Sequence, residues 1–150
     1  MRIETAAEST DELLDAFRRL IPQLTKNPPH LSRNEITALI KSTCSMLFLA
    51  RADDGVIVGA LSLTVYRVPT GIRSIIEDVI VDESARGQGI GEALIRRALE
   101  TAKEADATHV TLTSNPKREA ANRLYQKMGF IKRETNAYIY KLTDDSHFQK

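Results

Sequence analysis

Three glycines at alternating positions, 87, 89 and 91, mark the stretch of this sequence best suited to hold an anion. The stretch reads Arg86-Gly87-Gln88-Gly89-Ile90-Gly91 and lies between an apolar run ending at Val81 and an amphipathic pattern beginning at Ile90. Glycine has no side chain to keep a ligand away from the backbone N–H groups. A helix start behind the loop adds unpaired N–H groups and the positive end of the helix dipole. The order strand, glycine loop, helix therefore predicts a phosphate-binding loop.

The spacing differs from two common nucleotide-binding loops. A dinucleotide fingerprint requires a third glycine at position 92, where this chain has Glu92, and it expects βαβ units before the loop. A P-loop requires Lys followed by Ser or Thr, whereas Gly91 precedes Glu92 and Ala93. The remaining alternative to an anion site is a tight structural turn.

The residues before the loop predict one strand, two helices and three further strands. Arg2 to Glu4 suits a short strand, and Ser9 with Glu12 has the form of a capping box for a helix from about residue 10 to 20. Ser32 and Glu35 repeat that pattern before a second helix that reaches about Ser42. Three apolar runs joined by short turns then predict an antiparallel meander, with strands at residues 46–52, 56–67 and 72–81.

The hydrophobic pattern after Gly89 changes to helical spacing, with Ile90, Leu94 and Ala98 on one face. A strand at 109–114 should follow, parallel to its predecessor because a helix joins the two. A helix starting at Pro116 should end before Gly129, and residues 137–142 should form a last strand. The order β-α-α-β-β-β-α-β-α-β predicts a mixed α/β fold with one domain at 1–142 and a polar tail at 143–150.

Composition narrows the function classes. In 150 residues, 21 basic and 20 acidic side chains give a net charge of +1, which does not favour a nucleic acid or an anionic membrane as partner. Cys44 is the only cysteine, so no internal disulfide can form, and we expect a soluble cytoplasmic protein without signal peptide or membrane span. His30, His109 and His147 lack metal-ligand spacing, so no metal site is expected.

Two motifs resemble the GNAT superfamily of acyl-CoA N-acyltransferases. Residues 86–91 match its Arg/Gln-x-x-Gly-x-Gly/Ala signature for acetyl-CoA. Residues 118–130, which end in Leu124-Tyr125-Gln126-Lys127-Met128-Gly129-Phe130, look like its Ala-x-x-Leu-Tyr-x-x-x-Gly-Phe ending. The two motifs stand in the right order in the C-terminal half, and the N-terminal half agrees in its order of elements.

The resemblance implies a donor site for acetyl-CoA. The backbone of Gly87, Gln88, Gly89, Ile90 and Gly91 would hold the CoA pyrophosphate. The pantetheine arm would pair with backbone groups at Val79, Ile80 and Val81. Arg86 is either a phosphate contact or a surface charge.

One position departs from the family pattern. Family members frequently carry an asparagine that contacts pantetheine where this chain has Arg118. Asn115 or Asn122 could replace that contact, or Arg118 could approach a phosphate. Helix capping and a solvated helix face are the structural alternatives for the two asparagines.

The resemblance also implies catalytic residues. Ile76-Glu77-Asp78-Val79-Ile80-Val81 is similar to the Leu-Glu-Asp-x-x-Val strand of diamine acetyltransferases, in which the glutamate is the proposed base. Tyr125 matches the tyrosine that protonates the leaving thiolate. Asp78 would face away from Glu77 in a regular strand, whereas a β-bulge would turn both carboxylates toward a cationic amine.

The expected activity is N-acetylation, with direct transfer from acetyl-CoA to an amine. The alternative on the same fold is a non-catalytic module that binds acyl-CoA or regulates. A small-molecule amine is favoured as acceptor over a protein N-terminus or lysine, but the residues do not select among a simple primary amine, an aminoglycoside-like molecule and a protein N-terminus. A homodimer formed through the C-terminal half is also possible. It would be compatible with either function.

Overall fold

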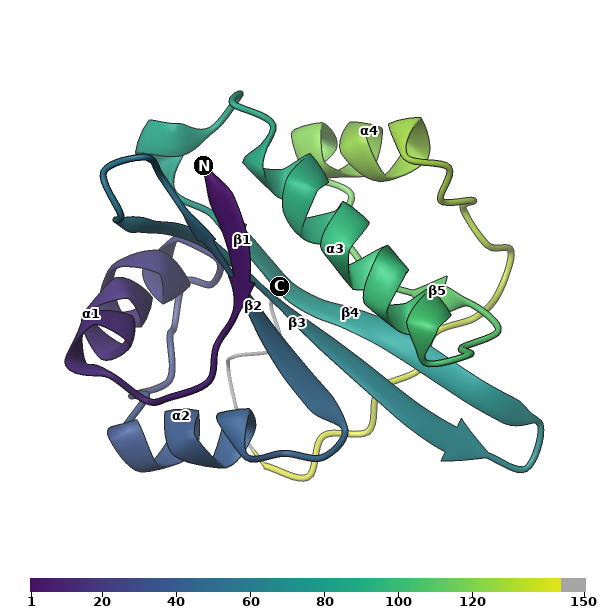
Figure 1. The fold of residues 1–150 in the computed structure, drawn as a ribbon. Coiled ribbons are helices and arrows are strands. Elements are labelled where there is room, and N and C mark those ends of the chain that lie inside the picture. The colour runs from purple at the N-terminus through teal and green to yellow at the C-terminus, as the bar shows by residue number, and fades with distance from the viewer. Residues whose placement is uncertain (144–150) are drawn as a thin grey trace.

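The computed structural model describes residues 1–143, and these form a five-stranded sheet in the order β1-β2-β3-β4-β5 (Figure 1). The strands are β1 (Arg2–Thr5), β2 (Ser45–Arg51), β3 (Ile57–Val68), β4 (Gly71–Val81) and β5 (Val110–Thr111). The first four pair antiparallel in sequence order, and β5 is parallel to β4. The predicted mixed sheet and its meander are therefore confirmed. Residues 144–150 of the predicted polar tail lie outside the described residues.

Helices cover both faces of this sheet. The α-helices are α1 (Asp11–Leu20), α2 (Arg33–Ile40), α3 (Ile90–Glu104) and α4 (Glu119–Lys127), and two short 3-10 helices are η1 (Ile21–Gln23) and η2 (Glu83–Ala85). Figure 1 shows α1 and α2 on one side of the sheet and α3 and α4 on the other. In the described part of the chain, no helix combines the length and apolar character that a membrane crossing needs.

Two separate groups of buried side chains hold these layers together. One joins α1 and α2 to the sheet and includes Phe17, Leu20 and Ile36. The other joins α3 and α4 to the opposite face and includes Leu94 and Ile95, both 0% exposed. Residues of β3 contribute to both groups, which explains why that strand is apolar along most of its length rather than strictly alternating.

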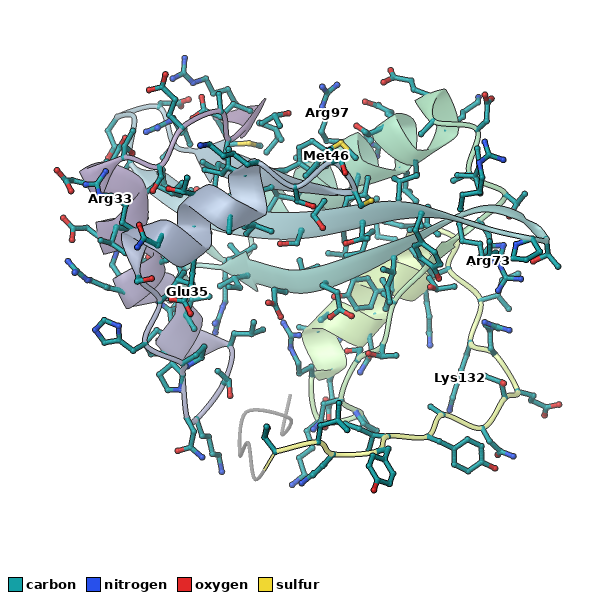
Figure 2. All side chains as sticks on the ribbon, turned by 90° about the horizontal axis from the view of Figure 1, so that it is seen from below. Arg33, Glu35, Met46, Arg73, Arg97 and Lys132 are labelled. Atoms are coloured by element: carbon teal, nitrogen blue, oxygen red, sulfur yellow. The ribbon has the colours of Figure 1, made fainter. Side chains whose placement is uncertain are left out.

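The two predicted capping boxes differ in outcome. Ser32 and Glu35 form the expected box at the start of α2, with the Glu35 carboxylate accepting from Ser32 N over 2.7 Å. Figure 2 shows the Glu35 side chain on this helix. At α1 the prediction is wrong by one residue, because Thr10 is the N-cap and accepts from Leu13 N. The Ser9 hydroxyl donates to Arg33 O instead, which ties the start of α1 to α2.

Strands β4 and β5 pair over a short distance and then separate. Their parallel pairing consists of Ser74 with Val110 and Ile75 with Thr111. The predicted strand at 109–114 is therefore shortened to two residues, and residues 112–114 continue without strand structure. Beyond Ile75, the described part of the chain provides no strand on this side of β4. The separation leaves a stretch of β4 edge open to a ligand.

The C-terminal region departs most from prediction. The last helix begins at Glu119 rather than Pro116, because residues 116–118 form a turn. The predicted strand at 137–142 is wrong: these residues adopt no strand structure, and Tyr138 and Tyr140 are 90% and 88% exposed. Their alternating apolar pattern indicates a strand, but a strand needs a partner edge, and the segment that carries Lys132 runs apart from the sheet (Figure 2).

Candidate active site

A cavity of about 260 Å³ opens where β4 and β5 separate. Its walls come from β4, from Leu24 just after η1, from the segment that follows β5, from the turn before α4, and from α4 itself. The lining residues are Leu24, Ile76, Glu77, Asp78, Val79, Leu112, Thr113, Ser114, Asn115, Pro116, Arg118 and Tyr125. The topology thus gathers both proposed catalytic residues, Glu77 and Tyr125, at one cavity.

A β-bulge shapes the β4 wall of the cavity. Ser62 of β3 pairs with Glu77 and Ala60 pairs with Ile80, so two β4 residues oppose one β3 residue between these pairs. Asp78 has a φ of 50°, which is uncommon for a residue with a side chain. The bulge considered from the sequence is therefore present. It interrupts alternation, and both Glu77 and Asp78 line the cavity.

Tyr125 supplies a buried phenol to the same cavity. It is 6% exposed and packs edge-on against Phe130, with ring centroids 5.9 Å apart. Burial raises the pKa of this phenol above its usual value of 10, and the positive charge of Arg118 partly opposes that rise. The phenol is consequently protonated at neutral pH, as a proton donor must be.

The end of α4 fixes this arrangement. Gly129 has a φ of 94°, and its N–H donates to Gln126 O while Phe130 N donates to Tyr125 O. These two hydrogen bonds form a Schellman motif, which requires the left-handed conformation that glycine adopts without strain. The Gly-Phe pair of the sequence motif thereby ends α4 and returns the Phe130 ring to Tyr125.

The glycine loop lies on the exposed surface at the start of α3. Gly87 and Gly89 have φ values of 76° and 77°, and Gly89 is the N-cap of the helix. The first-turn N–H groups of α3 have no partner within the helix, as at any helix start. Gly91 serves packing, because a Cβ there would lie 3.2 Å from Leu124 Cδ2 of α4. The loop therefore offers backbone donors and brings α3 close to α4.

An ion pair that the sequence did not reveal anchors the connection from β4 to this loop. Asp82 is 7% exposed and forms an ion pair with Arg19 of α1. Its Oδ1 also accepts from Ser84 N over 3.1 Å, and Gln23 Oε1 accepts from Glu83 N over 2.9 Å. An aspartate two residues before Ser84 is typical of a turn, but no local pattern names its partner Arg19.

Two arginines bind carbonyl groups on β4. Arg118 Nη2 donates to Val79 O over 3.1 Å, and Arg86 Nε donates to Val81 O over 3.3 Å. Val79 lines the cavity, whereas Ile80 is buried against the α1 side of the sheet at 3% exposure. The backbone at which a pantetheine arm is expected to pair is therefore bordered by two cations.

The two asparagines considered as donor contacts lie together in the turn before α4. Asn115 Oδ1 accepts from Lys117 N over 2.9 Å, and Asn122 Nδ2 donates to Asn115 O over 3.0 Å. Asn115 lines the cavity, and Asn122 is not among the lining residues. In this structure both side chains bind backbone groups of the turn.

The residues present fit acetyl-CoA. The loop offers N–H donors for a pyrophosphate. Beyond Ile75 the edge of β4 that faces β5 has no strand partner in the described part of the chain, and an extended amide-containing arm could pair there beside the side chains of Arg86 and Arg118. The Ser114 hydroxyl is buried and has no hydrogen-bond partner among the described residues, which suits a site completed by a polar ligand. In the described part of the chain, no group of three or more His, Cys, Asp or Glu residues could hold a metal ion.

Comparison with known proteins places this site in a family. The sequence model of the acetyltransferase (GNAT) family matches residues 10–130. A glucosamine 6-phosphate N-acetyltransferase of Trypanosoma brucei brucei is 32% identical over 124 residues, which cover 78% of this chain and 82% of that protein. A probable glucosamine 6-phosphate N-acetyltransferase 2 of rice, Oryza sativa subsp. japonica, is 42% identical over 65 residues, but these cover 43% of this chain and 37% of that protein.

Comparison with solved structures gives the same family. An acetyltransferase of Trypanosoma brucei superposes with a TM-score of 0.75 at 29% identity, covering 93% of this chain and 99% of that one. The chain therefore belongs to the GNAT family of acetyltransferases, enzymes that transfer an acetyl group from acetyl-CoA to an amine.

Proposed function

We propose that this protein transfers an acetyl group from acetyl-CoA directly to a small-molecule amine. The observation that carries the proposal is that Glu77 of β4 and Tyr125 of α4 line one cavity beside the open edge of β4. One residue is a carboxylate and the other a buried phenol, so the cavity contains both a base and an acid.

The proposed reaction begins with removal of a proton from the ammonium group, because a protonated amine cannot attack a thioester. Glu77 accepts that proton directly or through a water molecule. A backbone N–H near Val79 or Ile80 stabilises the oxyanion of the tetrahedral intermediate. Tyr125 then gives its proton to the sulfur as the carbon–sulfur bond breaks. No covalent acyl-enzyme is formed on this route.

The charges and size of the cavity favour a small cationic acceptor. Glu77 and Asp78 bring two carboxylates to a volume of about 260 Å³, which suits an ammonium group on a compact molecule. The names of two relatives make glucosamine 6-phosphate the first amino sugar to test. We propose amine recognition through these carboxylates whatever the rest of the acceptor is.

The test is an acceptor panel followed by release of free thiol from acetyl-CoA. The panel contains glucosamine, glucosamine 6-phosphate, an aminoglycoside, a polyamine and a peptide with a free N-terminus, and mass spectrometry identifies the product. We expect acetylation of a small amine at a higher kcat/KM than of the peptide. Binding of acetyl-CoA without transfer to any amine would support the non-catalytic alternative, and preferential acetylation of the peptide would overturn the proposed acceptor class.

We also propose that the chain forms a homodimer through residues 131–142. Four large apolar side chains in this segment are each at least 87% exposed: Ile131, Tyr138, Tyr140 and Leu142. Grouped exposed apolar side chains are typical of protein interfaces. Light scattering after size exclusion should give twice the chain mass for the wild type, and the double substitution Tyr138→Lys with Tyr140→Lys should give a monomer. A wild-type monomer at micromolar concentration would contradict the dimer.

The cytoplasm is the proposed compartment. Cys44 is an exposed free thiol, which suits a reducing environment. Fractionation of cells of the source organism, with an antibody to the chain, should recover it with cytoplasmic markers. Recovery with a membrane or secreted fraction would contradict this proposal.

A further inference from the structure

Arg118 places a positive charge at the cavity that contains the proposed acid. It is the N-cap residue of α4, and it lines the cavity together with Glu77, Val79 and Tyr125. Its guanidinium donates to Val79 O over 3.1 Å. Family members frequently carry an uncharged asparagine at this position, so Arg118 adds a charge there.

The open edge of β4 explains why Arg118 reaches this carbonyl. Parallel pairing with β5 stops at Ile75, and the bulge at Asp78 interrupts the regular register before Val79. Val79 O therefore accepts from a side chain where a regular strand would provide a backbone N–H. The hydrogen bond directs the guanidinium to the cavity rather than to solvent.

The turn before α4 fixes the backbone of Arg118. Asn115 O accepts from Arg118 N over 3.0 Å and from Asn122 Nδ2 over 3.0 Å. Asn122 N in turn donates to Arg118 O over 3.0 Å. These contacts fix the backbone from which the Arg118 side chain extends. Less conformational entropy is therefore lost when the guanidinium binds an anion.

Among the residues that line the cavity with Tyr125, Arg118 is the one with a positive charge. The charged residues that line the cavity are Glu77 and Asp78 from β4 and Arg118 from the start of α4. The Arg118 charge opposes the effect of burial on the phenol. An anion formed in this partly buried cavity would interact with that charge more strongly than in water.

We propose that Arg118 stabilises the negative charge that forms on Tyr125 when the phenol gives its proton to the departing sulfur. This inference rests on the proposed acetyl transfer. The electron pair of the carbon–sulfur bond goes to sulfur, the phenol proton follows it, and the resulting phenolate is held by the guanidinium. The amine nitrogen loses two protons in all, of which one restores the phenol and the other is released to solvent.

The test compares Arg118→Gln, Arg118→Lys and the matched control Arg123→Gln. Arg123 lies on the same helix with a side chain 72% exposed and pairs with Glu119. Each variant is checked for folding by thermal unfolding. The phenol pKa of Tyr125 is measured without acetyl-CoA, by difference absorbance against the same variant carrying Tyr125→Phe, and kcat is measured at saturating substrates.

We expect Arg118→Gln to raise the Tyr125 pKa and to lower kcat at least tenfold. Arg118→Lys should keep most of both properties because it keeps the charge, and Arg123→Gln should resemble the wild type. In a Tyr125→Phe background, Arg118→Gln should cause little additional loss of kcat, since the group it stabilises is gone. An unchanged Tyr125 pKa in Arg118→Gln, or an equal loss of kcat in both backgrounds, would overturn the proposal.

The two proposals fail in different ways. If the wild type releases no thiol with any amine, the proposed function is wrong, and the Tyr125 pKa in the variants still reports whether Arg118 acts on the phenol. If Arg118→Gln does not fold, Arg118→Met replaces it in the same measurements, because methionine keeps a long side chain and removes the charge. A Tyr125 pKa in Arg118→Met equal to that of the wild type would contradict the role of the cation.

Discussion

The Glu77 carboxylate on β4 and the Tyr125 phenol on α4 line one cavity, although they come from opposite ends of the β4-α3-β5-α4 segment. Two features bring them together. The separation of β5 from β4 opens the sheet beside Glu77, and the close contact of Gly91 with Leu124 holds α4 against α3.

Replacing Tyr125 by Phe should lower kcat by about 100-fold or more, the usual size of a general acid's contribution. KM for acetyl-CoA should change little, because the ring and its packing against Phe130 remain. Steady-state thiol release measures both constants. Tyr66→Phe is the control, since Tyr66 lies on β3 and is 38% exposed. An unchanged kcat in Tyr125→Phe would remove Tyr125 from the acid role.

The same phenol should make folding stability depend on pH in the alkaline range. Its folded pKa is raised by burial above the unfolded value of about 10. Above pH 10 the unfolded chain has therefore lost this proton while the folded chain retains it, so the free energy of unfolding should fall as pH rises. Denaturant unfolding from pH 8 to 11 should show a shallower decline in Tyr125→Phe than in the wild type. Equal slopes would contradict the raised pKa.

Replacing Gly89 by Ala should raise KM for acetyl-CoA about tenfold with a small effect on kcat. Gly89 has a φ of 77°, which costs a residue with a Cβ roughly 1–2 kcal/mol, and relief of that strain would reorient the loop N–H groups. Gly55→Ala is a matched control, because Gly55 has a φ of 89° in the turn between β2 and β3, and both positions have open space for a Cβ. A KM that rises equally in both variants, or in neither, would contradict a donor site at this loop.

Replacing Asp82 by Asn should destabilise the protein and weaken donor binding. The substitution keeps an acceptor for Ser84 N but removes the charge that pairs with Arg19. Since the Arg19 side chain is 41% exposed, we expect a loss of about 1 kcal/mol rather than the full cost of a buried pair. For a chain of this size that lowers Tm by roughly 2–4 °C.

Thermal unfolding and KM for acetyl-CoA measure the two effects of Asp82→Asn. Asp15→Asn is the control, because the pair of Asp15 with Arg18 is exposed on α1 and is expected to contribute little. Should Asp82→Asn match the control in Tm, the anchoring role of the Arg19 pair would be wrong.

Local patterns predicted those parts of the fold that depend on neighbours in the sequence. The capping box at Ser32, the meander, the start of α3 at Ile90 and the end of α4 at Gly129 were all predicted from short-range rules. The motifs also suggested Glu77 and Tyr125 as candidate catalytic residues, and the structure brings both to one cavity.

What the sequence did not predict depends on partners far along the chain. Strand β5 ends at Thr111 because its pairing with β4 stops there. The predicted strand at 137–142 lacks a partner edge in the described structure. Arg118 donates to Val79 O next to the bulge at Asp78, and the pair of Arg19 with Asp82 joins α1 to the connection that precedes the glycine loop. No short-range rule encodes such pairings.

The pH dependence of kcat/KM in Glu77→Gln tests the central claim most directly. The control is Glu100→Gln, which removes an exposed carboxylate of α3. At pH 7 we expect Glu77→Gln to lose about 100-fold or more. The loss should shrink as pH approaches the pKa of the amine, because solution then supplies the neutral nucleophile. Glu100→Gln should follow the wild type throughout. A wild-type value of kcat/KM in Glu77→Gln at pH 7 would contradict acetyl transfer with Glu77 as its base.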